Sequence, residues 1–220
     1  IPVVVNRSFL ALLNGTRLFV LNRLNGEVLL NVPAGSVPAA GPAVSERRAY
    51  VPMLDGLIVA HRLEPVTDAP GEFSRAKAEA GLTEAEKGQA TQQRRESMRL
   101  RQDGPRPLRT HSAGYPYLAP VVLRETPYDE YVGWVTDVGY WYVAQVDRRS
   151  EDALAILFRI GFSGHLPSQP VYAPPKTPGV TAYGVLYLVT SDGFVRAIDE
   201  RSGNTLWRSS TGAACEQAPV

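Results

Sequence analysis

The 220-residue sequence predicts an all-β protein built from repeated meanders of short antiparallel strands. Pairs of apolar runs joined by glycine turns recur along the chain, and prolines followed by β-branched residues recur at regular intervals. Pro120 and Pro170 lie 50 residues apart, and Pro170 and Pro219 lie 49 apart. Repeats of about 40–50 residues with four short strands each are typical of β-propeller blades. We therefore expect about four blades of four antiparallel strands, in an arc that need not close.

The clearest repeat lies near the C-terminus. Two apolar, β-prone runs at 185–190 and 194–199 flank a turn that contains Gly193. A second turn at Gly203 leads to a third run at 204–208. Alternating strands joined by tight Gly turns predict a β-meander, because glycine adopts positive φ without a steric penalty.

Two other residues of this repeat have expected structural roles. Asp199 ends a strand, and we expect its carboxylate to accept hydrogen bonds from the amides of the following turn. Trp207 carries a large apolar surface, and we expect it to cover its sheet and pack between neighbouring blades.

Weaker copies of the same pattern occur earlier in the chain. Near the N-terminus they comprise runs 9–13, 16–21 and 27–30 with turns at Gly15 and Gly26. Two further hairpins are runs 49–53 and 57–61 around Gly56, and runs 131–135 and 140–144 around Gly139. A blade buries its faces only against neighbouring blades, so these copies are expected to stack side by side.

One segment, residues 66–112, does not fit the strand pattern. It is highly charged, rich in Ala and Gln and nearly free of β-branched residues, which favours a helical or disordered insertion in the second blade. Residues 1–65 and 113–220 are then the blade material. Arg94, Arg95, Arg99 and Arg101 give the insertion a basic run that could bind phosphates or an acidic protein surface.

The best repeat resembles a known family. Asp192-Gly193, Ala197-Ile198-Asp199, Ser202-Gly203 and Leu206-Trp207 are similar to the repeat of pyrroloquinoline-quinone-like (PQQ-like) propellers. This resemblance implies a propeller fold. The family includes quinoprotein dehydrogenases, which hold the quinone and Ca²⁺ in the central channel, and non-enzymatic members such as the propeller lipoprotein of the outer-membrane assembly machine.

The residues favour a non-catalytic role, although they leave enzyme activity open. Cys215 is the single cysteine, so the adjacent cysteine pair of many quinoproteins is missing. The three histidines lie far apart, so no metal site is expected, and neither a nucleophile elbow nor a P-loop occurs. We assign no catalytic residues and expect no cofactor.

The formal net charge is +1, so no nucleic-acid partner is expected. No run of residues is apolar enough to span a bilayer, so no transmembrane segment is expected.

The sequence therefore supports two hypotheses. The first is a non-catalytic scaffold for protein–protein interaction in the bacterial periplasm or cell envelope. The alternative is a fragment of a PQQ-dependent oxidoreductase that uses PQQ and calcium. In either case the remaining blades would come from a longer chain or from a second copy, because an open arc leaves sheet faces uncovered.

Overall fold

The protein is an all-β propeller arc, which confirms the predicted fold class. The computed structural model describes residues 3–63, 83, 107–125, 129–147, 154–175 and 183–215. In these ranges every regular element is a strand, and the strands form four separate antiparallel sheets of four strands each.

Each sheet is one blade, and its strands follow chain order from one edge to the other. Blade 1 comprises β1 (Val3–Val5), β2 (Phe9–Asn14), β3 (Arg17–Asn22) and β4 (Val28–Pro33). Blade 2 comprises β5 (Ala43–Val44), β6 (Arg48–Pro52), β7 (Leu57–Arg62) and β8 (Leu108–His111). Blade 3 comprises β9 (Val121–Glu125), β10 (Asp129–Val135), β11 (Tyr140–Asp147) and β12 (Leu154–Gly161). Blade 4 comprises β13 (Val171–Ala173), β14 (Val185–Thr190), β15 (Phe194–Asp199) and β16 (Thr205–Ser210).

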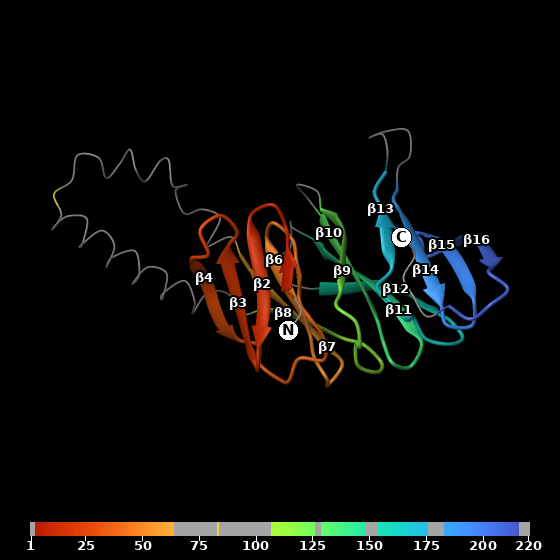
Figure 1. Ribbon diagram of the computed structural model, residues 1–220, viewed down its shortest axis with the longest axis horizontal. Helices are drawn as coiled ribbons and strands as arrows, with labels where there is room; N and C mark the ends of the chain where they lie inside the picture. The colour runs from red at the N-terminus through yellow and green to blue at the C-terminus, as the bar shows by residue number, and fades with distance from the viewer. Residues whose placement is uncertain are drawn as a thin grey trace.

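The blades follow one another along an arc, with blade 1 and blade 4 at its two ends (Figure 1). The short first strands are the inner ones, since β1 contacts β5 and β5 contacts β9. The outer strands β8 and β12 also contact each other. Among the residues that the structure describes, one face of each terminal blade therefore has no neighbouring sheet.

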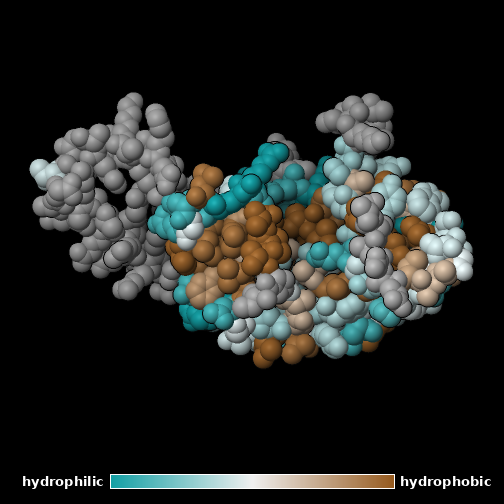
Figure 2. Space-filling model, in the orientation of Figure 1, coloured by the Kyte–Doolittle hydropathy of each residue, from teal (hydrophilic) through white to brown (hydrophobic). Residues whose placement is uncertain are grey.

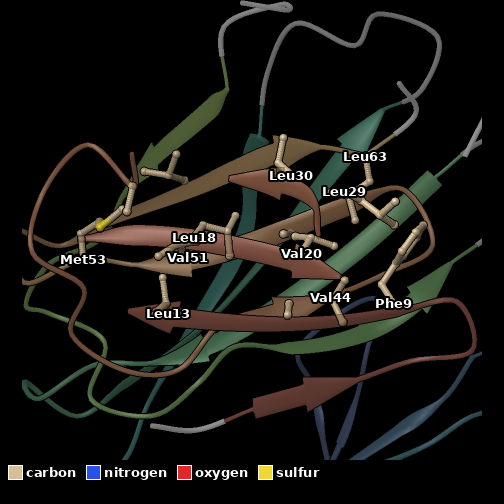
Figure 3. Packing of buried hydrophobic residues seen from close by; sticks show 14 residues of the cluster. Phe9, Leu13, Leu18, Val20, Leu29, Leu30, Val44, Val51, Met53 and Leu63 are labelled. Atoms are coloured by element: carbon tan, nitrogen blue, oxygen red, sulfur yellow. The ribbon is translucent and has the colours of Figure 1, made fainter. Parts of the chain in front are cut away.

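Apolar side chains between the blades hold the arc together. Between blades 1 and 2, side chains of β2 and β3 interdigitate with those of β6 and β7 (Figure 3). Four side chains at the centre of this cluster are fully buried, with 0% exposed, and they are Leu18, Val20, Val51 and Met53. Because burial of an aliphatic side chain contributes about 1.5–3 kcal/mol, this contact is the main stabilising interaction of the two blades.

Aromatic residues dominate the other two contacts. Between blades 2 and 3, the ring of Trp134 stacks on that of Tyr142 with centroids 5.5 Å apart. Between blades 3 and 4, the buried Trp141 packs with Leu186 and Leu188. Strand alternation places Tyr142 and Trp141 on opposite faces of blade 3, so this blade uses aromatic rings in both directions.

The end of the predicted insertion is wrong. Residues Leu108–His111, which the sequence assigned to segment 66–112, form β8 and pair with β7 in continuous register from Leu57↔His111 to Ala60↔Leu108. Blade 2 needs this fourth strand, and the buried side chain of Leu108 joins the core between blades 2 and 3. The helical or disordered state expected for the rest of the segment lies outside the described residues.

Gly133 provides a test of the packing between blades 3 and 4. A Cβ atom at this position would overlap the indole of Trp141, which is buried and cannot move away. We expect Gly133→Ala to lower the free energy of unfolding by about 2–3 kcal/mol, measured by denaturant titration. Gly161→Ala is the matched control, because its Cβ would lie 3.4 Å from the Tyr140 ring, an ordinary contact. Equal stability of the two variants would contradict this packing.

Candidate interaction surfaces

One rim of the arc is bridged by polar bonds between the loops that join the first and second strands. Asn6 Nδ2 of blade 1 donates to Ser45 O of blade 2 at 2.8 Å, and Ser8 Oγ donates to Glu46 Oε2 at 2.7 Å. The Glu46 amide then donates to Glu125 Oε2 of blade 3 at 3.2 Å. These bonds fix the relative positions of successive blades at this rim.

A charged group continues this rim to blade 4. Arg124 Nη1 lies 3.8 Å from Glu200 Oε1, and the Tyr172 hydroxyl donates to Glu200 Oε2. Glu200 is almost fully buried. Burial, followed by the hydrogen bond and the charge of Glu200, raises the pKa of Tyr172, so this hydroxyl remains a donor.

The opposite rim carries a repeated backbone bond. At each junction, an N–H in the turn between the second and third strands donates to a carbonyl in the connection leaving the preceding blade. The three bonds are Leu54 N to Val37 O (3.0 Å), Asp137 N to Tyr115 O (3.1 Å) and Ser191 N to His165 O (2.8 Å). The same geometry therefore recurs at every blade junction that the structure describes.

A pocket of about 610 Å³ opens at this rim between blades 3 and 4. Tyr117, His165 and Cys215 are among its lining residues. The Tyr117 hydroxyl accepts from Leu166 N at 2.7 Å and donates to Leu166 O at 3.1 Å, and burial raises its pKa. The Cys215 thiol lies 3.4 Å from Thr211 Oγ1, within its own turn. These contacts give the pocket walls a structural role.

A buried charge cluster joins blades 2 and 3. Arg48 Nη1 lies 3.1 Å from Glu130 Oε2, and the Tyr50 hydroxyl donates to Glu130 Oε1 at 2.7 Å. All three side chains are fully buried. Burial and the neighbouring Glu130 carboxylate hold the pKa of Tyr50 well above its ordinary value. A buried carboxylate needs this compensation, since desolvation of an isolated charge costs several kcal/mol.

Sequence reasoning missed this cluster because Glu130 lies 82 residues from Arg48 and 80 residues from Tyr50. A usable signal was present. Arg48 precedes three apolar residues in the second strand of its blade, and Glu130 occupies a comparable place in β10. A charged residue of each sign at corresponding positions of neighbouring repeats favours an ion pair between blades.

Removing one partner of this cluster should destabilise the protein strongly. We expect Glu130→Leu to lower the free energy of unfolding by about 3–5 kcal/mol, because it leaves the Arg48 guanidinium buried without a counter-charge. The double variant Arg48→Met with Glu130→Leu should recover most of this loss, as measured by denaturant titration. If the double variant were less stable than Glu130→Leu alone, the cluster would not be an isolated ion pair.

His61 lies in β7 with a pKa lowered from 6.5 to about 4, caused by burial and then by the charge of Arg109. Within the described residues its Nε2 atom has no hydrogen-bond partner. The folded state therefore favours the neutral imidazole, whereas the unfolded chain takes up a proton near pH 6.5.

The pH dependence of stability follows from this difference. The contribution of neutral His61 is complete above pH 6.5 and is lost as the pH falls toward 4, because the unfolded state then binds the additional proton. We expect the loss between pH 7 and pH 4 to be smaller in His61→Gln than in the wild type by about 2–3 kcal/mol, in parallel urea titrations. Equal pH profiles would show that His61 titrates normally in the folded protein.

The structure places the predicted turn glycines at positive φ, between 57° and 84°. They are Gly15, Gly26, Gly56, Gly139, Gly193 and Gly203. The Asp199 carboxylate accepts from Arg201 N at 2.8 Å and from Ser202 N at 3.2 Å. The predicted arginines of the interaction site, Arg94, Arg95, Arg99 and Arg101, lie outside the described residues.

The expected position of Trp207 between two blades stays a prediction, because the described residues contain only one of the two blades that would enclose it. Trp207 lies on β16 with 47% of its surface exposed and packs against Tyr187 of its own sheet at a centroid distance of 6.0 Å. Its face of blade 4 points away from blade 3, so no described sheet covers it.

Within the described residues, no group of three or more His, Cys, Asp or Glu side chains is arranged to hold a metal ion. In the same part of the chain, no helix has the length and apolar character needed to cross a membrane.

Solved structures show what this chain resembles. It is similar to BamB from Moraxella catarrhalis, with a TM-score of 0.58 and 11% identity over 96% of this chain and 48% of that one. It is also similar to the β-propeller domain of Cps50 (Swd1) from Myceliophteria thermophila, with a TM-score of 0.56 and 11% identity over 96% and 55% of the two chains. A third similar structure is BBS1N in complex with ARL6DN, with a TM-score of 0.53 and 11% identity over 94% and 51%.

These likenesses establish the propeller fold. The chain spans about half the length of the propellers that it matches. No protein-family model matches the sequence. No curated protein matches it either.

Proposed function

We propose that this protein is a non-catalytic PQQ-like propeller scaffold of the bacterial cell envelope that binds a protein partner through its charged insertion. The observation that carries the proposal is the position of the insertion. It connects β7 to β8, and these two strands nevertheless pair in unbroken register. Blade 2 is therefore complete whatever the connection contains, and binding residues usually lie on such connections of a rigid scaffold.

The corresponding connections between the third and fourth strands of blades 1 and 4 are short. β3 ends at Asn22 and β4 begins at Val28, while β15 ends at Asp199 and β16 begins at Thr205. The connection in blade 2 runs instead from residue 63 to residue 107. Long connections within compact domains are usually functional or serve as linkers. The basic residues Arg94, Arg95, Arg99 and Arg101 favour an acidic surface on the partner.

Two observations support the finer parts of the proposal. The repeat at Asp192-Gly193 and Leu206-Trp207 resembles that of PQQ-like propellers, which include an outer-membrane assembly lipoprotein. BamB is among the structural neighbours, and the BBS1N propeller was solved in complex with ARL6DN. The repeat resemblance and these structural neighbours support the proposal of an envelope location and a protein partner.

We propose no cofactor for this chain. The single cysteine excludes an adjacent cysteine pair within these residues, and no observation favours the alternative of a PQQ-dependent oxidoreductase. The absence of bound PQQ and calcium stays a prediction.

Removal of the insertion should abolish partner binding without unfolding the scaffold. The deletion should span 66–106, replaced by a short Gly-Ser linker from Pro65 to Pro107, so that β8 is kept. We expect this deletion, and the Glu substitution of Arg94, Arg95, Arg99 and Arg101, to reduce partner recovery from envelope extracts at least about tenfold. Quantitative affinity purification would measure the recovery, and thermal melting would check the fold.

A charge-matched control distinguishes specific contacts from total charge. Four exposed arginines elsewhere, Arg7, Arg17, Arg23 and Arg201, are replaced by Glu in the control variant. This variant should keep its partners. Unchanged partners after deletion of 66–106 would reject the insertion as the contact site.

A further inference from the structure

Blade 1 carries two asparagine–glycine pairs, Asn14-Gly15 and Asn25-Gly26. An asparagine in this position is prone to lose its side-chain amide, because the backbone nitrogen of the next residue attacks Cγ and a glycine has no Cβ atom to obstruct the attack. Both pairs lie at connections between strands, and Figure 2 shows hydrophilic residues at the ends of the blade 1 strands with apolar residues between them. All four residues are exposed, so exposure does not distinguish the two pairs.

Hydrogen bonds hold both reacting groups of the Asn25-Gly26 pair. The Gly26 N–H donates to Asn22 O at 2.9 Å. Asn25 Oδ1 accepts from Glu27 N at 3.0 Å. Asn22 N donates to Glu27 O at 2.8 Å and closes the connection. The attacking nitrogen and the amide carbon therefore have fixed positions, and the reaction requires these bonds to break first.

The Asn14-Gly15 pair lies in a more open turn. β2 ends at Asn14 and β3 begins at Arg17, which leaves a two-residue hairpin loop. Among the described residues, no hydrogen bond involves the Asn14 side chain or the Gly15 N–H. A Cβ atom on Gly15 would meet no described atom within 4 Å. The loop is held through Thr16 O, which accepts from Ala34 N at 2.8 Å, so the two reacting groups themselves stay unrestrained.

The difference in hydrogen bonding determines how readily each pair reacts. An intramolecular attack is fast only from conformations in which the two reacting atoms already lie close together. An exposed loop with few contacts samples such conformations through local opening, whereas a loop closed by several hydrogen bonds samples them rarely. The Gly15 nitrogen therefore reaches Asn14 Cγ more often than the Gly26 nitrogen reaches Asn25 Cγ.

The rim that carries these hairpin turns accommodates a carboxylate next to the turn glycine. The residue before this glycine is Asp55 in blade 2 and Asp192 in blade 4. Asp192 Oδ2 accepts from Ser163 Oγ at 2.9 Å. In blade 1, strand pairing places Arg17 opposite Asn14. A carboxylate at this position of blade 1 would therefore lie opposite a guanidinium, which is a favourable cross-strand pair.

We propose that Asn14 is a site of spontaneous deamidation and that the fold protects Asn25 from the same reaction. The Gly15 nitrogen loses its proton to hydroxide and attacks Asn14 Cγ. The new nitrogen–carbon bond closes a five-membered succinimide, the bond from Cγ to Nδ2 breaks, and the amide nitrogen takes a proton from water and leaves as ammonia. Water then opens the ring at either carbonyl and yields aspartate or isoaspartate.

The modification changes the chemistry of one rim of the arc. Both products add a negative charge to the hairpin turn of blade 1, and isoaspartate also adds one methylene to the backbone at the end of β2. Blade 1 thereby acquires an acidic turn like those at Asp55 and Asp192. The inference rests on the geometry of two turns and does not depend on the proposed scaffold function.

Timed incubation of the folded chain tests this selectivity. Peptide mapping by mass spectrometry measures the gain of one mass unit at each asparagine, since the side-chain NH2 is replaced by OH. We expect Asn14 to deamidate at least about tenfold faster than Asn25 at neutral pH. The rate should rise with pH, because the attacking nitrogen must lose a proton. Asn14→Gln should remove the fast reaction, because the longer side chain would have to close a less favourable six-membered ring.

The unfolded chain is the matched control. In concentrated guanidinium chloride both pairs keep their Asn-Gly sequence and lose the hydrogen bonds that separate them, so their rates should converge. Equal rates in the folded chain, a faster reaction at Asn25, or an unreactive Asn14 would each overturn the proposal. A difference that persists in denaturant would also overturn it, because the flanking sequence and not the fold would then set the rates. Circular dichroism checks that the chain stays folded during incubation.

Discussion

Burial of sheet faces is the constraint on which the whole structure depends. A four-stranded sheet made of continuous apolar runs cannot lie in water on either side, so each blade is stable only against its neighbours. The three inter-blade clusters satisfy this need for the two middle blades. The polar bonds at the rims add orientation, since they connect equivalent loops of successive blades.

The buried pair Arg48–Glu130 shows how orientation is specified within an apolar contact. Aliphatic faces slide over one another at little cost, because dispersion and hydrophobic burial have no direction. A carboxylate that must meet both a guanidinium and the Tyr50 hydroxyl allows a single alignment of blades 2 and 3. Such a cluster contributes little to the free energy of folding, because its desolvation cost offsets much of its Coulomb attraction. Its main effect is to select one alignment of the two blades.

The sequence predicted the repeated local features well and the long-range ones poorly. The turn glycines and the strand runs around Gly193 are local, so the chain within a few residues determines them. Strand β8 was missed because it follows a long charged segment and its sequence, Leu108–His111, alternates only weakly. The packing of Trp207 between two blades stays a prediction, because the repeat motif describes a blade with neighbours on both sides and the described residues give blade 4 one neighbour. The Arg48–Glu130 pair depends on how repeats stack, which no local pattern records.

The connection between β7 and β8 has a consequence for how such arcs diversify. The entropy of closing a flexible loop grows only with the logarithm of its length, by about 0.6 kcal/mol for each doubling. Lengthening a link of about five residues to the span from 63 to 107 is roughly three doublings, or about 2 kcal/mol. A folded arc tolerates that penalty at one hairpin, so new recognition segments can be acquired or exchanged there while the core stays unaltered. Propeller hairpins of this kind are therefore natural acceptor sites for grafted domains.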